Sequence, residues 1–253
     1  MTFSQPTKWD EATGVAGQLT AELSLFIRKA SDNMPRSLQS ALGPSEIGEP
    51  CARKLAYAWL NWERTNESSD PLPSIMGTGA HAWMAEQFSK SPRYLVEHRI
   101  HLPGGISGSL DLYDLDLCTV VDWKFPGATA FKRYVKEGPS DIYRVQSHLY
   151  GYGLERAGQR PQHVAIAFLP RAGMLSGMKV WSEPYDRTVA ERALERLEVV
   201  TNLVCDLNVE DQPENWNLIP SRPSAICTYC PWHLPMSNDL SKGCPGQQRE
   251  GTK

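Results

Sequence analysis

The sequence predicts an α/β or α+β fold in which helices pack against one sheet. Three observations support this prediction. Apolar residues recur at helical spacing up to about residue 90, they alternate at the period of a strand from 94 to 125, and helices and further strands follow. No Pro- or Gly-rich linker divides the 253 residues, so we expect one domain. It comprises a helical N-terminal part (1–90), a core (91–210) and a Cys-rich tail (211–253).

The elements are expected in the following order. A helix covers 15–31, and Ser45 caps a second helical region that runs through Trp62. A polar loop over 66–73 leads to a third helix over 77–90. Three strands follow at 94–102, 106–113 and 117–125, and a loop with Gly127 and Gly138 then precedes a helix over 139–157. Strands at 163–169 and 178–182 and a helix over 186–207 complete the core, and little regular structure is expected from 212 onward.

Composition excludes several classes of protein. With 41% hydrophobic and 22% charged residues, the chain is not disordered. No apolar run approaches the ~20 residues of a membrane span, and residues 1–10 lack an apolar signal core. We therefore expect a cytoplasmic protein of a bacterial or phage-infected cell, without a membrane partner.

Two carboxylates and a lysine form the first candidate site. Asp111 ends a Gly-x-x-Asp motif, and Asp122 and Lys124 form Asp-x-Lys on the next predicted strand. Adjacent antiparallel strands can bring the two carboxylates together, where Mg²⁺ or Mn²⁺ would relieve their repulsion. Asp122 and Lys124 are two residues apart, so they share a strand face. Taken alone, Asp-x-Lys also fits a surface ion pair.

Two further motifs lie beside this one in the sequence. His81 follows Gly77-Thr78-Gly79-Ala80 near the start of a predicted helix, and Gln146 and Tyr150 share one face of another. Taken alone, each fits a structural role better than a functional one. Glu97 is either an additional acid or a solvated strand residue.

Together, these residues resemble the RecB-type branch of the PD-(D/E)xK nuclease superfamily over about residues 44–152. The resemblance implies a restriction-endonuclease-like core, which is a central mixed sheet flanked by helices. It implies that the metal ligands are His81, Asp111, Asp122 and the Trp123 carbonyl. It further implies that the catalytic set is Asp111, Asp122, Lys124, Gln146 and Tyr150, with Gln146 and Tyr150 also contacting DNA.

Four of the six cysteines form a second constellation. Cys51 lies upstream, Cys227 and Cys230 form Cys-x-x-Cys, and Cys244 follows after thirteen residues. The set resembles that of the iron–sulfur exonucleases of the same branch, similar to AddB-type and CRISPR-adaptation nucleases, in which a 4Fe–4S cluster joins the N-terminal helices to the tail. A Zn²⁺ site that uses Cys244 or His233 as its fourth ligand is the alternative. Cys118 and Cys205 are expected to be buried thiols.

The expected function is a metal-dependent DNA exonuclease acting in recombination, repair or end processing. Its partners would be single- or double-stranded DNA ends and, in addition, a recombination protein. Residues 123–160 hold 7 basic and 3 acidic side chains, so phosphate contacts are expected from Lys132, Arg133, Lys136 and Arg144, unless the segment is a solvated surface. The alternatives are a catalytically silent DNA-binding protein, a zinc-stapled nuclease and an electron-transfer protein.

Overall fold

The computed structural model describes residues 14–33, 42–66 and 70–246. Its longer helices are α1 (Gly14–Asp32), α3 (Ala52–Trp59), α4 (Leu72–Phe88), α5 (Ala128–Glu137), α6 (Asp141–Arg156) and α7 (Arg187–Leu207), with a single turn at α2 (Pro44–Ile47). The strands are β1 (Tyr94–His101), β2 (Ser107–Asp114), β3 (Thr119–Lys124), β4 (His163–Phe168) and β5 (Lys179–Pro184). Short 3₁₀ turns are η1 (Pro103–Gly105), η2 (Leu175–Gly177), η3 (Pro213–Leu218) and η4 (Ala225–Tyr229).

The five strands form one mixed sheet in the order β1-β2-β3-β4-β5. Only β3 and β4 run parallel, and α5 and α6 form the crossover between them. The other neighbouring strands pair antiparallel. The predicted sheet flanked by helices is therefore confirmed, and the strand that carries Asp122 and Lys124 lies at its centre.

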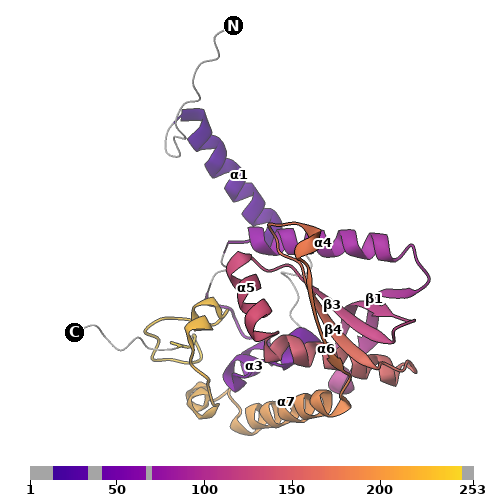
Figure 1. The fold of residues 1–253 in the computed structure, drawn as a ribbon. Helices are drawn as coiled ribbons and strands as arrows, with labels where there is room; N and C mark the ends of the chain where they lie inside the picture. The colour runs from indigo at the N-terminus through magenta and orange to yellow at the C-terminus, as the bar shows by residue number, and fades with distance from the viewer. Residues whose placement is uncertain (1–13, 34–41, 67–69, 247–253) are drawn as a thin grey trace.

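Helices cover both faces of the sheet (Figure 1). On one face, Val120 and Val164 join the main core with α6 and α7. On the other face, Trp123 and Ala167 form a smaller core, against which Met84 and Phe88 of α4 pack. Alternate residues of β3 thus serve opposite cores, as strand geometry requires. Asp122 lies two residues from Val120, which directs it toward α6.

α1 extends away from the body of the molecule (Figure 1). Its apolar residues Val15, Leu23 and Phe26 are exposed, so the predicted helix forms without contributing to the main core. Among the described residues, no helix is both long and apolar enough to cross a membrane.

The structure corrects two helix boundaries. Ser45 does not cap a continuous helix through Trp62, because the chain forms the short α2 and then α3, with Gly43 and Cys51 as the respective caps. Pro50 lies between the two helices, and it can neither continue a helix nor leave its predecessor helical. α4 begins at Leu72 and not at 77, since Pro73 fits the first helical turn.

The structure also contains a helix that the sequence analysis missed. The segment between Gly127 and Gly138 was expected to be a loop, but these glycines cap α5 at its two ends. Gly138 has φ of 81° and ψ of −177°, a backbone conformation that glycine adopts and that cannot continue the helix. As a result, Lys132, Arg133 and Lys136 lie on a helix and are exposed.

The tail contributes to the main core. Trp216, Ile219 and Trp232 are buried there, and the ring of Trp216 stacks on Tyr57 of α3 at 4.2 Å. The Tyr57 hydroxyl donates a hydrogen bond to the Leu240 carbonyl. Little regular structure follows residue 212 apart from two 3₁₀ turns, as predicted, but aromatic packing orders this segment.

Candidate active site and cysteine pocket

β2 and β3 place the two predicted carboxylates side by side. Leu112 pairs with Val121, so one further step along the two strands brings Asp111 next to Asp122. The Asp111 carboxylate accepts a hydrogen bond from the backbone N–H of Trp123 at 2.7 Å. This contact fixes Asp111 across the strand that carries the Asp-x-Lys motif.

Lys124 lies among three side chains that hold its ammonium group. Its Nζ atom is 2.5 Å from Asp122 Oδ2 and donates a hydrogen bond to Gln146 Oε1 at 3.4 Å. The same nitrogen lies 4.6 Å from the centre of the Tyr143 ring, a cation–π contact. The sequence analysis did not identify Tyr143, whose role depends on how α6 packs over β3.

The Gln146 and Tyr150 pair braces this arrangement from α6. Gln146 donates from Nε2 to the Tyr150 hydroxyl at 2.9 Å, while its Oε1 faces Lys124. Both side chains are buried, as is Trp123, whose ring packs against Phe88. Because the Tyr150 and Trp123 rings are both buried, neither offers an exposed face on which a DNA base could stack.

His81 approaches the carboxylates from α4. Its Nδ1 atom lies 3.2 Å from Asp111 Oδ1, and its ring packs edge-on against Phe125 at 5.3 Å. Three elements that are distant in the sequence, α4, β2 and β3, therefore meet at Asp111.

The electrostatics of the site are dominated by buried negative charge. Burial raises the pKa of Asp122, Lys124 opposes this shift and the neighbouring Asp111 adds to it, and the net result is a pKa of about 6. Burial, and then Asp111, also raise the pKa of Glu97.

Glu97, which the sequence left open as an additional acid or a solvated strand residue, is exposed on β1 and lies opposite the strand that carries Asp111. It lies between two residues of β1 that pair with Leu110 and Leu112, and so faces Asp111. Its φ of 48° is unusual for a residue other than glycine, and such strain often marks functional sites. The turn at Gly104 and Gly105 sets how β1 pairs with β2, and this pairing is the sequence signal that could have placed Glu97 opposite Asp111.

The acidic group suits a hard divalent cation. Asp122 Oδ2 is buried, and the Lys124 ammonium at 2.5 Å is the cation that faces it. Two ligands at right angles on an octahedral ion lie about 3 Å apart, close to the 3.2 Å between His81 and Asp111. As they stand, no three His, Cys, Asp or Glu side chains in the described part of the chain, the four cysteines included, are arranged to hold an ion; at this site the Asp122 carboxylate faces Lys124. An ion bound there would require the Asp122 carboxylate to turn.

The predicted phosphate contacts differ in their availability. Lys132, Arg133 and Lys136 are exposed on α5. Arg144 on α6 instead lies 2.5 Å from Glu183 of β5, which also contacts the buried His148 at 2.7 Å. Its charge is therefore compensated within the protein, and we expect it to contribute less to phosphate binding than the three residues of α5.

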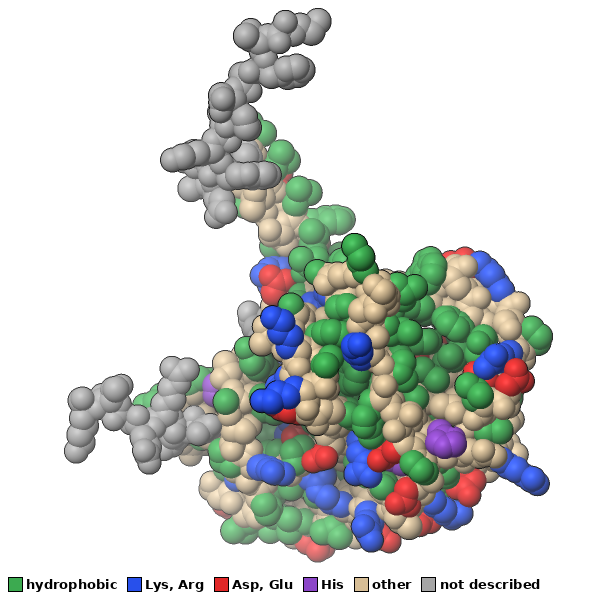
Figure 2. Space-filling model, in the orientation of Figure 1, with side chains coloured by type: hydrophobic (Ala, Val, Ile, Leu, Met, Phe, Trp, Pro, Cys, Tyr) green, Lys and Arg blue, Asp and Glu red, His purple; other side chains and the backbone are tan. Residues whose placement is uncertain are grey.

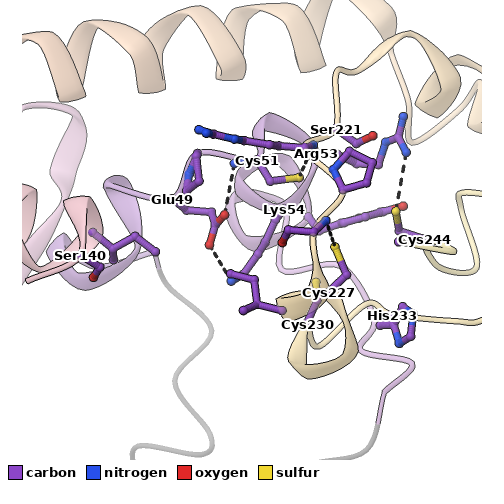
Figure 3. Close-up of a pocket in the computed structure, with 18 of the residues that line it drawn as sticks. Glu49, Cys51, Arg53, Lys54, Ser140, Ser221, Cys227, Cys230, His233 and Cys244 are labelled. Atoms are coloured by element: carbon purple, nitrogen blue, oxygen red, sulfur yellow. Dashed lines mark hydrogen bonds and ion pairs between the residues drawn. The ribbon is translucent and has the colours of Figure 1, made fainter. Parts of the chain in front are cut away.

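The four cysteines of the second constellation line one pocket of about 330 Å³. Figure 3 shows the sulfur atoms of Cys51, Cys227, Cys230 and Cys244 facing a shared space, with His233 at its edge. Cys51 comes from the start of α3, and the other three come from the tail. Residues up to 193 positions apart in the sequence thus meet at one point.

Nitrogen donors surround these sulfur atoms. The backbone N–H groups of Arg222 and Ser224 donate to Cys51 at 3.5 Å and to Cys227 at 3.3 Å. Burial raises the pKa of Cys230, and Cys51 and Cys244 add to this shift because thiolates repel one another. A bound cation would remove the repulsion, so the pocket suits a metal group.

The remaining cysteines are not buried thiols as expected. Cys205 is exposed and Cys118 is half-buried. Cys205 lies near the end of α7, beside the buried stripe that ends at Val204, so its side chain faces solvent. Neither residue lines the cysteine pocket.

Comparisons with known proteins give a partial likeness of fold. No family model matches the chain, and no curated protein matches its sequence. A phage-related exonuclease from Haemophilus somnus is 11% identical, with a TM-score of 0.47 over 69% of this chain and 98% of its own. LHK-Exo, an alkaline exonuclease from Laribacter hongkongensis solved in complex with dAMP, is 13% identical, with a TM-score of 0.43 over 69% of this chain and 96% of its own. Likeness at this level carries no inference about activity, which must rest on the geometry of the site.

Proposed function

We propose that this protein is a metal-dependent deoxyribonuclease that removes nucleotides from DNA ends, in recombination, repair or end processing. The single observation that supports this most strongly is the placement of Lys124. Its ammonium group lies between Asp122 and Gln146, beside the pair formed by Asp111 and His81. Carboxylates that can hold a cation, next to a fixed lysine, suit phosphodiester hydrolysis.

Each side chain has a defined task in this proposal. His81, Asp111, Asp122 and the Trp123 carbonyl would hold Mg²⁺ or Mn²⁺, which supplies charge stabilisation and lowers the pKa of a nucleophilic water. Lys124 positions the attacking water and stabilises the charge that develops on the phosphoryl oxygens. Gln146 and Tyr150 hold Lys124 in place through the hydrogen bonds described above.

Variants of Lys124 test this assignment. Lys124→Ala removes the cation next to the phosphate, so we expect cleavage to fall by at least about 100-fold, since one electrostatic group typically contributes 10²–10³. Binding to DNA and the circular-dichroism spectrum should change little. Lys90→Ala is the matched control, since that side chain is 62% exposed on the surface. Near-normal cleavage by Lys124→Ala would show that the active site is assigned wrongly.

We also propose that Cys51, Cys227, Cys230 and Cys244 bind a 4Fe–4S cluster with a structural role. The support is their convergence in one pocket and the N–H groups that point at two of the sulfur atoms. A cluster would neutralise the mutual repulsion of the thiolates and connect α3 to the tail. Zinc held by three cysteines and either Cys244 or His233 is the alternative occupant.

Metal analysis of anaerobically purified protein decides between these occupants. We expect brown protein with about four irons per chain, and loss of iron and colour in Cys51→Ser. Cys205→Ser is the matched control and should keep its iron, because Cys205 is exposed outside the pocket. Colourless protein with one zinc and no iron would assign the site to zinc.

A further inference from the structure

A second pocket adjoins the candidate active site. It measures about 260 Å³, and its lining includes Met76, Phe125, Leu169, Arg171, Met174 and Met178. These residues come from α4, from the segments that follow β3 and β4, and from the loop between β4 and β5. None of them has a task in the proposed catalysis.

The rim of this pocket exposes large apolar side chains. Met174 is 80% exposed and Met76 is 51% exposed. Figure 2 shows hydrophobic side chains gathered over α4 and the loop between β4 and β5, with Lys and Arg side chains bordering them. A contiguous apolar patch of this kind marks an interaction site, and methionine adapts well to flat ligands.

The pocket borders the candidate site at Phe125, which lines the pocket and whose ring packs edge-on against the His81 ring at 5.3 Å. Ala80, which also lines it, immediately precedes His81 on α4. Phe125 follows Lys124, and the N–H of Leu169 donates to the Lys124 carbonyl at 2.9 Å. A strand whose phosphate lies at the candidate site, beside His81, would therefore have a neighbouring base close to this pocket.

Arg171 adds a positive charge to the otherwise apolar pocket. Its Nε atom donates to the Phe125 carbonyl at 3.0 Å, which orients the guanidinium. Within the part of the chain that the structure describes, Arg171 has no acidic partner in an ion pair. An oriented and uncompensated guanidinium suits a phosphate.

We propose that this pocket binds one unpaired nucleobase of the DNA strand held at the candidate active site, with Arg171 on an adjacent phosphate. The proposal rests on the nuclease function proposed above. Apolar side chains and one cation match a base and its phosphate, and the volume suits a ligand smaller than the drug-sized molecules that fill larger pockets. Because the base must leave the duplex to enter, the preferred substrate is a single-stranded or frayed end.

Binding of single-stranded oligonucleotides in EDTA tests this proposal without cleavage. The probes are a labelled 20-nucleotide DNA and a series of the same strand in which each terminal nucleotide in turn lacks its base. For wild type, we expect one abasic position to weaken binding about 5-fold to 100-fold, the range for loss of one stacked base. In Met174→Ser with Met178→Ser, that penalty should disappear. Met236→Ser is the matched control, since Met236 is 93% exposed on the tail.

Arg171 provides an independent arm. Arg171→Ala should lower the dependence of log Kd on log salt concentration by about 0.7, the value for one phosphate contact on a single strand, and Arg171→Lys should restore it.

Three results would overturn the proposal. In the first, wild type cleaves DNA, but neither the abasic probes nor the methionine variants change the affinity for DNA. The proposed nuclease function would then hold, and the pocket would have no part in binding. In the second, the methionine variants alter only self-association measured by light scattering, which would make the patch a protein interface. In the third, wild type neither binds nor cleaves DNA, and both proposals fail.

Discussion

Asp122→Asn should make the protein more stable while removing its activity. The reason is that the fold holds a buried carboxylate against its preference: burial and Asp111 raise the Asp122 pKa from 3.8 to about 6. Each unit of pKa corresponds to ~1.4 kcal/mol. The ionised carboxylate therefore costs the fold up to about 3 kcal/mol relative to a neutral side chain of the same shape. In a domain of this size, that cost corresponds to about 6–12 °C in Tm.

The pH dependence of this effect has a defined sign. The folded pKa of Asp122 lies above the unfolded value, so between pH 3.8 and about 6 the folded protein binds more protons than the unfolded chain. The wild-type free energy of unfolding consequently loses this contribution as the pH rises through that window. Asn does not titrate, so the stability advantage of the variant should be near zero at pH 4 and complete by pH 7.

Thermal unfolding followed by circular dichroism measures this advantage, with EDTA present to exclude divalent ions. Asp116→Asn is the matched control because its side chain is 68% exposed, and its effect should stay within about 0.5 kcal/mol. If Asp122→Asn melts below wild type at pH 7, or if its advantage does not depend on pH, the argument from buried charge is refuted.

Three other changes give results of defined direction. Gly79→Ala should raise Tm by about 2–4 °C, because the added methyl group meets open space on a helix. Gly153→Ala should lower Tm, because its Cβ would lie 2.6 Å from a β1 side chain. Thermal scans in which both variants shift Tm in the same direction would contradict this. Lys136→Ala should reduce the slope of log Kd against log salt concentration for DNA binding by about one. Arg144→Ala should reduce that slope by less, since a carboxylate already pairs with Arg144. Equal slopes for the two variants in anisotropy titrations at several salt concentrations would contradict this. Trp216→Ala should cost about 3–5 kcal/mol and expose the tail to limited proteolysis, and an intact, protected tail would contradict its aromatic anchoring.

The spacing of residues along the sequence anticipates the centre of the site. The two-residue period of a strand puts Asp122 and Lys124 on one face, and the hairpin between β2 and β3 brings Asp111 beside them. Such local periodicity is set by the backbone alone. The contact of Tyr143 with Lys124 depends instead on the rotation of α6 over the sheet, and no local pattern records that rotation.

The errors in the fold have a similar physical origin. Gly127 and Gly138 were interpreted as loop residues, although glycine also ends helices, and only the structure shows which role applies. The tail was expected to lack regular structure, which is correct, but its order comes from Trp216 and Trp232 stacking on Tyr57. Long-range aromatic packing of this kind leaves no periodic signal.

The central claim, that this protein is a metal-dependent exonuclease, is tested most directly by comparing linear and covalently closed circular DNA as substrates. End-labelled linear single- and double-stranded DNA and a closed circle are incubated with the protein in Mg²⁺, Mn²⁺ or EDTA. We expect label to be released from linear DNA with either cation, little cleavage of the circle, and no cleavage of any substrate in EDTA. Cleavage that persists in EDTA, or linear DNA that stays intact with both cations while still bound by the protein, would contradict the claim.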